Sequence, residues 1–202
     1  MRLDEARRDL YRRLAREQGY KSRAAFKLLE ANERYDFLRP GSKVLDLGAA
    51  PGGWLQVASE LVGPEGIVVG VDLSKVSLRG YKNVVSLVAD VFDGGVAKKV
   101  LETLPGQADV VLSDLSPQVS GVWELDQTRQ LDLVLRTLEL SNTLLVPGGG
   151  VFCKVFEGEG TPEMRNTFKA TFERVRVVKP AASRSASSEL YYWCEGFKPG
   201  PP

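Results

Sequence analysis

Four aspartates each follow a short apolar segment that is typical of a β-strand: Asp46, Asp72, Asp90 and Asp114. At the first of them begins a glycine-rich loop, "DLGAAPGGW", which leads into the helix-like segment "LQVASELV". Because the carboxyl ends of parallel strands lie along one edge of a sheet, we expect the four carboxylates and the loop to surround one ligand. Carboxylates accept hydrogen bonds from ribose hydroxyls and exocyclic amines, and they attract cations.

The glycine loop does not fit the common phosphate-binding patterns. Counted from Gly48, its spacing is G-x-x-x-G-G, whereas dinucleotide-binding loops have G-x-G-x-x-G. The P-loop pattern is also absent, because Trp54 stands where its lysine would be. A ligand with a ribose, an adenine amine and positive charge but no phosphate suits the four acids, and S-adenosylmethionine (SAM) has these features. The alternative for each single aspartate is a turn or helix-capping residue.

The residue types present restrict the chemistry further. The chain has 202 residues, no histidine and two cysteines, Cys153 and Cys194. Without histidine, Ser-His-Asp and Cys-His catalysis are excluded, and any base must be Lys, Asp, Glu, Tyr or Cys. The cysteine spacing fits neither a metal site nor a disulfide framework, so we expect no metal and interpret both cysteines as packing residues. No apolar run is long enough to span a membrane and no signal peptide is evident, which predicts a cytoplasmic protein without membrane association.

Positive charge is concentrated in two segments. Residues 1–34 carry ten basic and six acidic side chains, and residues 165–184 carry six basic and one acidic, so the segments have net charges of +4 and +5. Since the whole chain has a net charge of +1, the rest carries −8. Basic segments of this kind can contact a polyanion such as RNA, or can be solvated surface. We expect the two segments to form one positive face beside the ligand pocket.

The rest of the chain alternates between strand-like and helix-like segments. Residues 1–39 are expected to form a basic helical segment with two helices, the second capped by Ser22, and residues 40–199 a ligand-binding catalytic core within one domain, 1–202. Apolar strands separated by helices indicate an α/β fold with a mostly parallel sheet covered by helices on both faces. The last two strands are joined by a serine-rich loop alone, so they are expected to be antiparallel. We expect strands near residues 43–49, 66–74, 84–91, 108–116, 147–156, 174–180 and 190–197.

Taken together, several segments resemble the FtsJ/RrmJ family of RNA 2′-O-ribose methyltransferases. The matching segments are "SRAAFKLLE", "DLGAAPGGW", "SDLSP", "CKVFEGEG" and "KPAASRSASSELYYWCEGFK", and the resemblance covers about residues 21–199. It implies the seven-stranded, Rossmann-like SAM-dependent methyltransferase fold. It also implies a cofactor site that comprises Asp46, Gly48, Gly52, Gly53, Trp54, Asp72, Asp90 and Asp114.

The same resemblance assigns a catalytic set of Lys27, Asp114, Lys154 and Glu189. Lys154 lies in an apolar strand, where an unpaired lysine is rare. A lysine acts as a base only when burial or a neighbouring cation lowers its pKa, and Lys27 would be that cation. The acids oppose this effect, so Lys154 either removes the proton of the hydroxyl or orients its lone pair.

The resemblance implies SAM-dependent methylation of a ribose 2′-hydroxyl, with a uridine of large-subunit ribosomal RNA as the expected substrate. Methylation of transfer RNA is an alternative, and a SAM-binding ribosome-assembly factor without catalysis is another. A nicotinamide-dependent reductase is disfavoured by the glycine spacing and by Asp90. The expected partner is RNA, free or within a ribosomal subunit, and the protein is expected to be a monomer.

Overall fold

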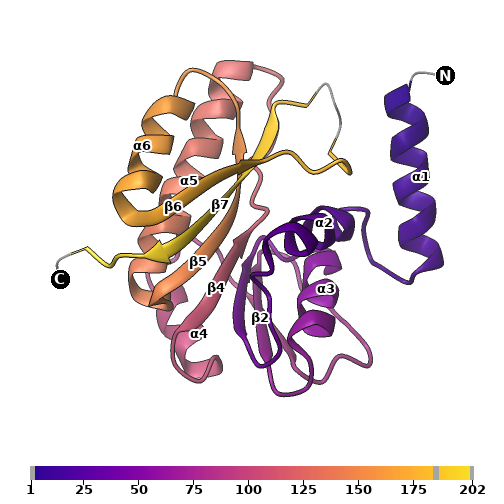
Figure 1. The fold of residues 1–202 in the computed structure, drawn as a ribbon, viewed down its shortest axis with the longest axis vertical. Coiled ribbons are helices and arrows are strands. Elements are labelled where there is room, and N and C mark those ends of the chain that lie inside the picture. The colour runs from indigo at the N-terminus through magenta and orange to yellow at the C-terminus, as the bar shows by residue number, and fades with distance from the viewer. Residues whose placement is uncertain (1–2, 184–186, 201–202) are drawn as a thin grey trace.

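A computed structural model describes residues 3–183 and 187–200, and within them one seven-stranded sheet carries the fold (Figure 1). The strands lie in the order β3-β2-β1-β4-β5-β7-β6. Their bounds are β1 (Lys43–Leu47), β2 (Ile67–Asp72), β3 (Val84–Val88), β4 (Ala108–Ser113), β5 (Leu145–Phe156), β6 (Phe172–Val178) and β7 (Glu189–Phe197). β1 to β5 pair in parallel, whereas β7 is antiparallel to both β5 and β6. The predicted fold class, including the reversed last strand, is confirmed.

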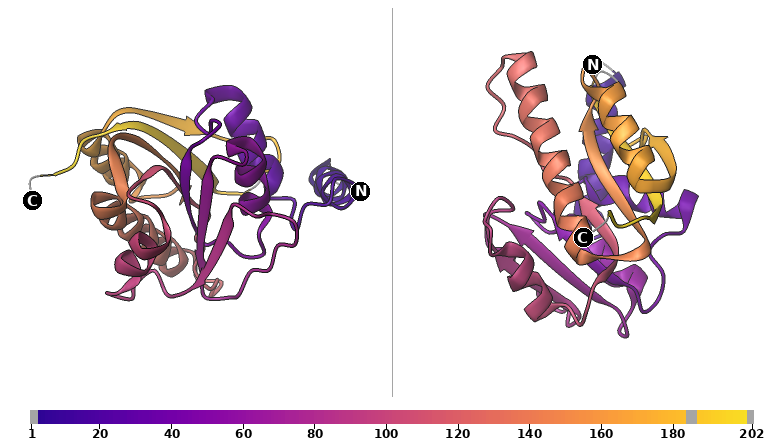
Figure 2. Two further views of the ribbon diagram at one scale, coloured as in Figure 1. Left: turned by 90° about the horizontal axis from the view of Figure 1, so that it is seen from below. Right: turned by 90° about the vertical axis from the view of Figure 1, so that its left-hand side faces the viewer.

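Helices cover both faces of this sheet (Figure 2). On one face, α2 (Ala25–Tyr35) and α3 (Gly53–Val62) pack on a core that includes Phe152 and Tyr191. On the other face lie α4 (Val96–Thr103), α5 (Trp123–Leu144) and α6 (Thr161–Thr171), over a core that includes Cys153 and Phe168. The central strands are buried on both faces, which explains why they read as continuous apolar runs.

The N-terminal helix α1 (Leu3–Glu17) stands apart from the sheet (Figure 1). Its C-terminal half meets α2, because the Tyr11 ring lies 5.4 Å from that of Phe26 and the Tyr11 hydroxyl donates to Glu30. Ala15 is buried there, while Leu10 is 40% exposed. None of the described helices is both long and apolar enough to cross a membrane.

Two local expectations have different outcomes. The link between β2 and β3 contains no helix, as its length predicted. The predicted Ser22 cap is wrong: α2 begins at Ala25, with no side-chain cap, and the Ala25 N–H donates to the Ser22 carbonyl. The turn that replaces the cap places Ser22 against Gly53, where a Cβ would approach the Ser22 hydroxyl oxygen to 2.4 Å, so a side chain at position 53 would require Ser22 to move.

Candidate active site

A pocket lies at the carboxyl ends of the first four strands, where the sequence predicts a ligand. Its volume is about 620 Å³, and its walls come from the ends of the first four strands, the segments that follow them, and Arg129, Asp132 and Leu133 of α5. Three of the predicted acids line it: Asp72, Asp90 and Asp114. Apolar walls that sequence reasoning missed are Leu73, Phe92 and Leu115. Single apolar residues in loops have no characteristic spacing, so the sequence pattern could not identify these three as pocket residues.

The floor of the pocket requires glycine at position 48. Gly48 has φ of +80°, and a Cβ there would lie 3.0 Å from the backbone nitrogen of Leu115. Its N–H donates to the Val71 carbonyl, which holds the loop after β1 against β2. A side chain would therefore strain the backbone and push the segment after β4 out of place.

Asp72 and Asp90 shape the pocket while keeping capacity for a ligand. Asp72 accepts the backbone N–H of Ala50 at 3.0 Å and that of Ser74 at 2.8 Å, one with each carboxylate oxygen. Asp90 accepts the N–H of Phe92 at 2.9 Å. The turn-residue alternative and the ligand-binding prediction are thus compatible, because each carboxylate oxygen has more than one acceptor site.

Asp46 is buried beneath the pocket without compensation. It has no exposed area, and neither carboxylate oxygen has a hydrogen-bond partner among the described residues. Burial raises the pKa of this carboxyl well above its ordinary value, and the charges of Asp114 and Asp72 add to the effect. A cationic ligand nearby would relieve this cost.

The four predicted catalytic side chains come together as two ion pairs. Lys27 from α2 lies 2.6 Å from Glu189 at the start of β7. Lys154 from β5 lies 3.2 Å from the Asp114 carboxylate, and it donates to the Asp114 carbonyl at 2.8 Å. Both lysines are 5% exposed. Asp114 is the member of the set that lines the pocket, so the Lys154–Asp114 pair adjoins it directly, and the Lys27–Glu189 pair lies behind it.

Tyr191 connects the two ion pairs, and sequence reasoning missed it. Its hydroxyl accepts from the Lys27 ammonium at 3.0 Å and donates to the Asp114 carboxylate at 2.8 Å. Burial, followed by the charges of Asp114 and Glu189, raises the pKa of the hydroxyl well above 10.0, so it remains a donor. Tyr191 is two residues from Glu189 on β7 and is paired with Lys154. Because side chains two residues apart on a strand lie on the same face, the sequence could have predicted that Tyr191 lies beside Glu189.

The remaining predicted cofactor residues lie beside the pocket rather than in its walls. Gly52 has φ of +112°, and a Cβ there would lie 2.8 Å from the Val76 side chain. Trp54 is 3% exposed, packs against Phe152 and Tyr191, and donates its indole N–H to the Ala24 carbonyl. Their contacts position the loop, and direct cofactor binding by Gly52, Gly53 and Trp54 stays a prediction.

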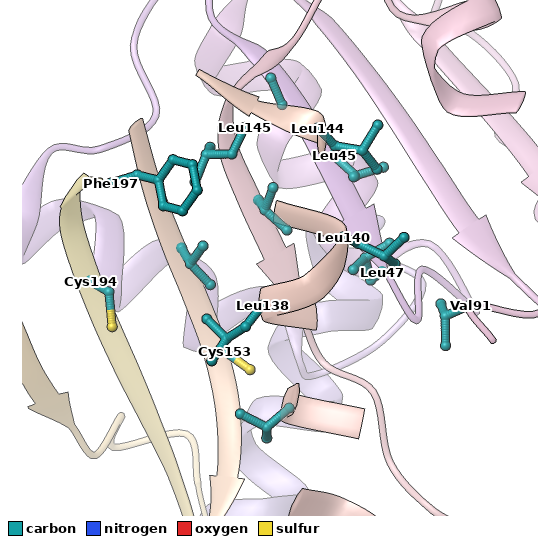
Figure 3. Packing of buried hydrophobic residues seen from close by; sticks show 14 of the residues in the cluster. Leu45, Leu47, Val91, Leu138, Leu140, Leu144, Leu145, Cys153, Cys194 and Phe197 are labelled. Carbon is teal, nitrogen blue, oxygen red and sulfur yellow. The ribbon is translucent and has the colours of Figure 1, made fainter. Parts of the chain in front are cut away.

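Both cysteines are packing residues, as the sequence predicted. Cys153 and Cys194 have no exposed area and point among Leu138, Leu145 and Phe197 (Figure 3). Burial raises the pKa of the Cys153 thiol to about 12. Cys153 therefore faces the α5 side of the sheet, opposite to its neighbour Lys154, and takes no part in the site.

The two basic segments meet only in part. The Arg23 guanidinium donates to the Ala182 carbonyl at 3.0 Å, which joins the N-terminal segment to the end of the second one. However, Arg174 and Arg176 form ion pairs with Glu195 on the outer strands, and α6 carries Arg165 and Lys169 on the opposite face of the sheet. The expectation of one positive face is wrong for Arg165 and Lys169, since α6 and α2 cover opposite faces of the sheet. Arg176 does meet the N-terminal segment, because its guanidinium lies 5.7 Å from the centroid of the Tyr35 ring at the end of α2. Arg184 is not among the residues that the structure describes, and the side chains of Arg7 and Arg8 are not described either.

Basic side chains do gather between α1 and α2. A groove of about 470 Å³ is lined by Arg12, Arg16, Lys21 and Arg23, together with Ala15, Tyr20 and Ser22. Arg12 and Arg16 are exposed. This groove is the described surface that best fits the predicted contact with a polyanion.

The arrangement of strands and the acid-lined pocket define a methyltransferase fold of the doubly wound α/β class. Residues 20–197 match the model of the FtsJ-like methyltransferase family, and the chain belongs to this family. It is 46% identical over 198 residues to a protein of Cenarchaeum symbiosum described as ribosomal RNA large subunit methyltransferase E, covering 98% of this chain and 100% of that protein. Membership excludes the reductase alternative.

Solved structures agree with this placement. A ribosomal RNA methyltransferase structure from Plasmodium falciparum superposes with a TM-score of 0.80 at 27% identity, covering 90% of this chain and 100% of that one. Aeropyrum pernix fibrillarin, solved with bound S-adenosyl-L-methionine, has a TM-score of 0.62 at 18% identity and covers 86% of this chain and 75% of its own. The second likeness concerns the fold alone.

Proposed function

We propose that this chain transfers a methyl group from SAM to a ribose 2′-hydroxyl of RNA, at a uridine of large-subunit ribosomal RNA. The observation that carries the proposal is the pair of buried lysine–carboxylate contacts at the edge of the acidic pocket. The relatives described as large-subunit ribosomal RNA methyltransferases support the substrate class. Cytoplasmic location and a monomeric state remain predictions.

The pocket residues fit SAM by their chemistry. The unpartnered carboxylate of Asp46 and the acids Asp72 and Asp114 near it call for positive charge, which SAM carries. Asp72 is suited to the ribose hydroxyls and Asp90 to the adenine amine, with Phe92 and Leu115 as apolar walls. When bound, SAM supplies a methyl group that its sulfonium activates.

Lys154 is placed to orient the acceptor hydroxyl. An ammonium has three N–H donors, and two of those on Lys154 point to oxygens of Asp114. The third has no partner among the described residues and can donate to the 2′-hydroxyl oxygen, which aims the remaining lone pair. We infer that this orienting role, rather than removal of the proton by a neutral lysine, is the main function of Lys154.

Lys27, Glu189 and Tyr191 hold the arrangement in place. Lys27 is fixed by Glu189 and by the Tyr191 hydroxyl, which in turn fixes the Asp114 carboxylate. In this scheme the hydroxyl proton leaves late, to a carboxylate oxygen of Asp114. Accurate orientation of reacting groups can supply roughly 7–11 kcal/mol of a barrier, more than a single base typically does.

Methylation of unmodified large-subunit ribosomal RNA tests the proposal. The product is expected to be a 2′-O-methyluridine, identified by mass spectrometry after nuclease digestion, and a 2′-deoxy nucleotide at the target should abolish transfer. Methylation of the deoxy target would show that the acceptor is a base. Transfer to transfer RNA alone, or SAM binding without any transfer, would select one of the two alternatives.

Calorimetry tests the cofactor separately. Asp90→Ala should weaken SAM binding by about 1–3 kcal/mol, the scale of one lost hydrogen bond to a charged group. Unchanged affinity would remove Asp90 from the site.

A further inference from the structure

Trp123, the first residue of α5, presents an exposed aromatic ring. It is 43% exposed, whereas Trp54 and Trp193 are 3% and 4% exposed. The ring stacks on Phe156, with ring centroids 6.1 Å apart and an interplanar angle of 21°. The indole is therefore backed by a second ring, while much of its surface stays exposed to solvent.

This stacked pair adjoins the catalytic set. Phe156 lies two residues beyond Lys154 on β5, so the two side chains leave the same face of the strand. Phe156 is also directly paired with Glu189 on β7. The aromatic pair thus lies next to the catalytic set, beyond Lys154 along β5.

The first turns of α5 are fixed on both sides. Asp126 is buried and accepts the Ser120 N–H and hydroxyl at 2.8 Å and the Gly121 N–H at 3.2 Å. Gln130 donates to the Lys154 carbonyl at 3.0 Å. Trp123 is therefore held in register with Lys154 before any ligand arrives.

The surroundings of Trp123 favour a flat, neutral ligand. Val119, Val122 and Leu125 are 71%, 54% and 41% exposed, and no described segment covers them. Glu124 and Glu157, the neighbours of the two rings in sequence, are exposed acids that repel phosphate. A nucleobase is a flat, neutral group that stacks on indole.

We propose that Trp123, backed by Phe156, stacks on the base of the nucleotide whose ribose is methylated; the inference rests on the proposed function. The ribose hydroxyl is the same in every nucleotide, so a contact outside the catalytic set must fix the sugar. Stacking fixes the position of the base, and through it the 2′-oxygen, at Lys154. Base–aromatic stacking tolerates any base, so Trp123 positions the nucleotide without selecting its identity.

Substitutions of Trp123 distinguish stacking from ordinary packing. Trp123→Ala should lower kcat/KM for the RNA roughly 5- to 140-fold, the range that corresponds to loss of one stacked base. Trp123→Phe keeps a flat ring and should recover most of the loss, whereas Trp123→Leu keeps apolar area and should not. Leu135→Ala, on the same helix and equally exposed at 43%, is the matched control and should leave kcat/KM unchanged. SAM affinity should be the same in all four variants.

An RNA whose target nucleotide keeps its 2′-hydroxyl but lacks its base completes the test. The activity of the wild-type protein on this abasic RNA should fall to about the activity of Trp123→Ala on the intact RNA. Trp123→Ala itself should be only slightly less active on the abasic RNA than on the intact RNA. The inference would be overturned if Trp123→Ala and the wild type were equally active on intact RNA. It would also be overturned if the substitution lowered activity on the abasic RNA as much as on the intact RNA.

Fluorescence separates this inference from the proposed function. If the wild-type protein methylates no RNA, the proposed function fails, but binding of a uridine-containing oligonucleotide can still be followed. Because the other two tryptophans are buried, quenching by the oligonucleotide that disappears in Trp123→Phe would support the stacking contact. Absence of quenching in the wild type would contradict it.

Discussion

Lys27 and Glu189 are 162 positions apart in the sequence, yet the ammonium of one lies 2.6 Å from the carboxylate of the other. Their side chains are 7% and 16% exposed. This pair joins the N-terminal helical segment to the last strand, and Tyr191 extends the contact to Asp114. The pair therefore has both a structural and a positioning role.

Loss of the Glu189 charge should destabilise the protein. Glu189→Gln leaves the Lys27 ammonium buried without its carboxylate, which is expected to cost about 3–5 kcal/mol in the free energy of unfolding, measured by chemical denaturation. The control is Glu102→Gln, which breaks the exposed pair with Lys98 at 3.8 Å and should cost less than about 1 kcal/mol. Similar costs for the two variants would show that the buried pair contributes no more than a surface one.

Substitutions of Lys154 should separate orientation from proton removal. Lys154→Ala should nearly abolish methyl transfer while SAM still binds, because the ammonium contacts Asp114 and, in the proposed mechanism, acts on the acceptor hydroxyl and not on the cofactor. Lys154→Arg keeps an N–H donor but cannot act as a base, so it should retain more activity than Lys154→Ala. Equal inactivity, with the fold and SAM affinity intact, would instead favour a neutral lysine base. Asp114→Ala should impair both cofactor binding and transfer.

The Tyr191 hydroxyl should matter for rate more than for cofactor affinity. Tyr191→Phe removes the donor to Asp114 and the acceptor of Lys27 but keeps the buried ring. Misplacement of a reacting group by about 1 Å can cost about 100-fold in rate, so we expect kcat to fall by about 10- to 100-fold. Tyr192→Phe, the neighbouring residue on the other face of β7, is the control and should leave kcat unchanged. An unaltered kcat for Tyr191→Phe would remove the hydroxyl from the positioning network.

The Asp46 carboxylate should lower the stability of the ligand-free protein in a pH-dependent way and favour binding of the cofactor. Its pKa in the folded chain is raised above the ordinary 3.8, so the unfolded state loses this proton first as the pH increases. The cost of Asp46 to stability is therefore absent below about pH 3.8 and grows above it. At neutral pH, Asp46→Asn should stabilise the ligand-free protein by about 1 kcal/mol or more, seen as a Tm increase of about 2–4 °C per kcal/mol.

The same substitution should weaken SAM binding, because it removes a buried carboxylate that interacts electrostatically with the pocket acids Asp72 and Asp114 and would attract a cationic ligand there. Thermal unfolding between pH 4 and 8, with and without SAM, measures both effects. A lower Tm for Asp46→Asn at neutral pH without SAM would mean that a favourable interaction of the carboxylate outweighs its burial.

Arginines of α1 should contribute to RNA affinity. Arg12 and Arg16 line the groove between α1 and α2, and reversing both to Glu should weaken RNA binding and leave SAM affinity unchanged. For single strands, removal of each phosphate interaction should reduce the slope of log K against log salt by about 0.7. Reversal of both Lys98 and Lys99 to Glu, on α4, changes the net charge by the same amount and is the control. If the double reversal leaves affinity and slope unchanged, these arginines are solvated surface.

The sequence by itself determined the fold class, and its resemblance to a methyltransferase family supplied the predicted site residues. Apolar runs separated by helical segments require a parallel sheet covered on both faces, and the acids and glycines at the strand ends follow from the position of the loops. Residue types restricted the chemistry: without histidine, the available groups were Lys, Asp, Glu, Tyr and Cys, and Cys153, next to Lys154 in a strand, was expected to face the other way. These inferences depend on local pattern, which the chain carries in full.

Only the tertiary structure decided how the site residues contact one another. That Tyr191 joins the two ion pairs, that Asp46 is left without a partner and that Trp123 reaches the end of β5 all depend on contacts between distant segments. The two basic segments had the same sign and similar charge, yet Arg165 and Lys169 lie on α6, which covers the face of the sheet opposite to α2, and Arg174 and Arg176 pair with Glu195. Strand order and packing, which no local spacing encodes, separate residues that composition alone would place together.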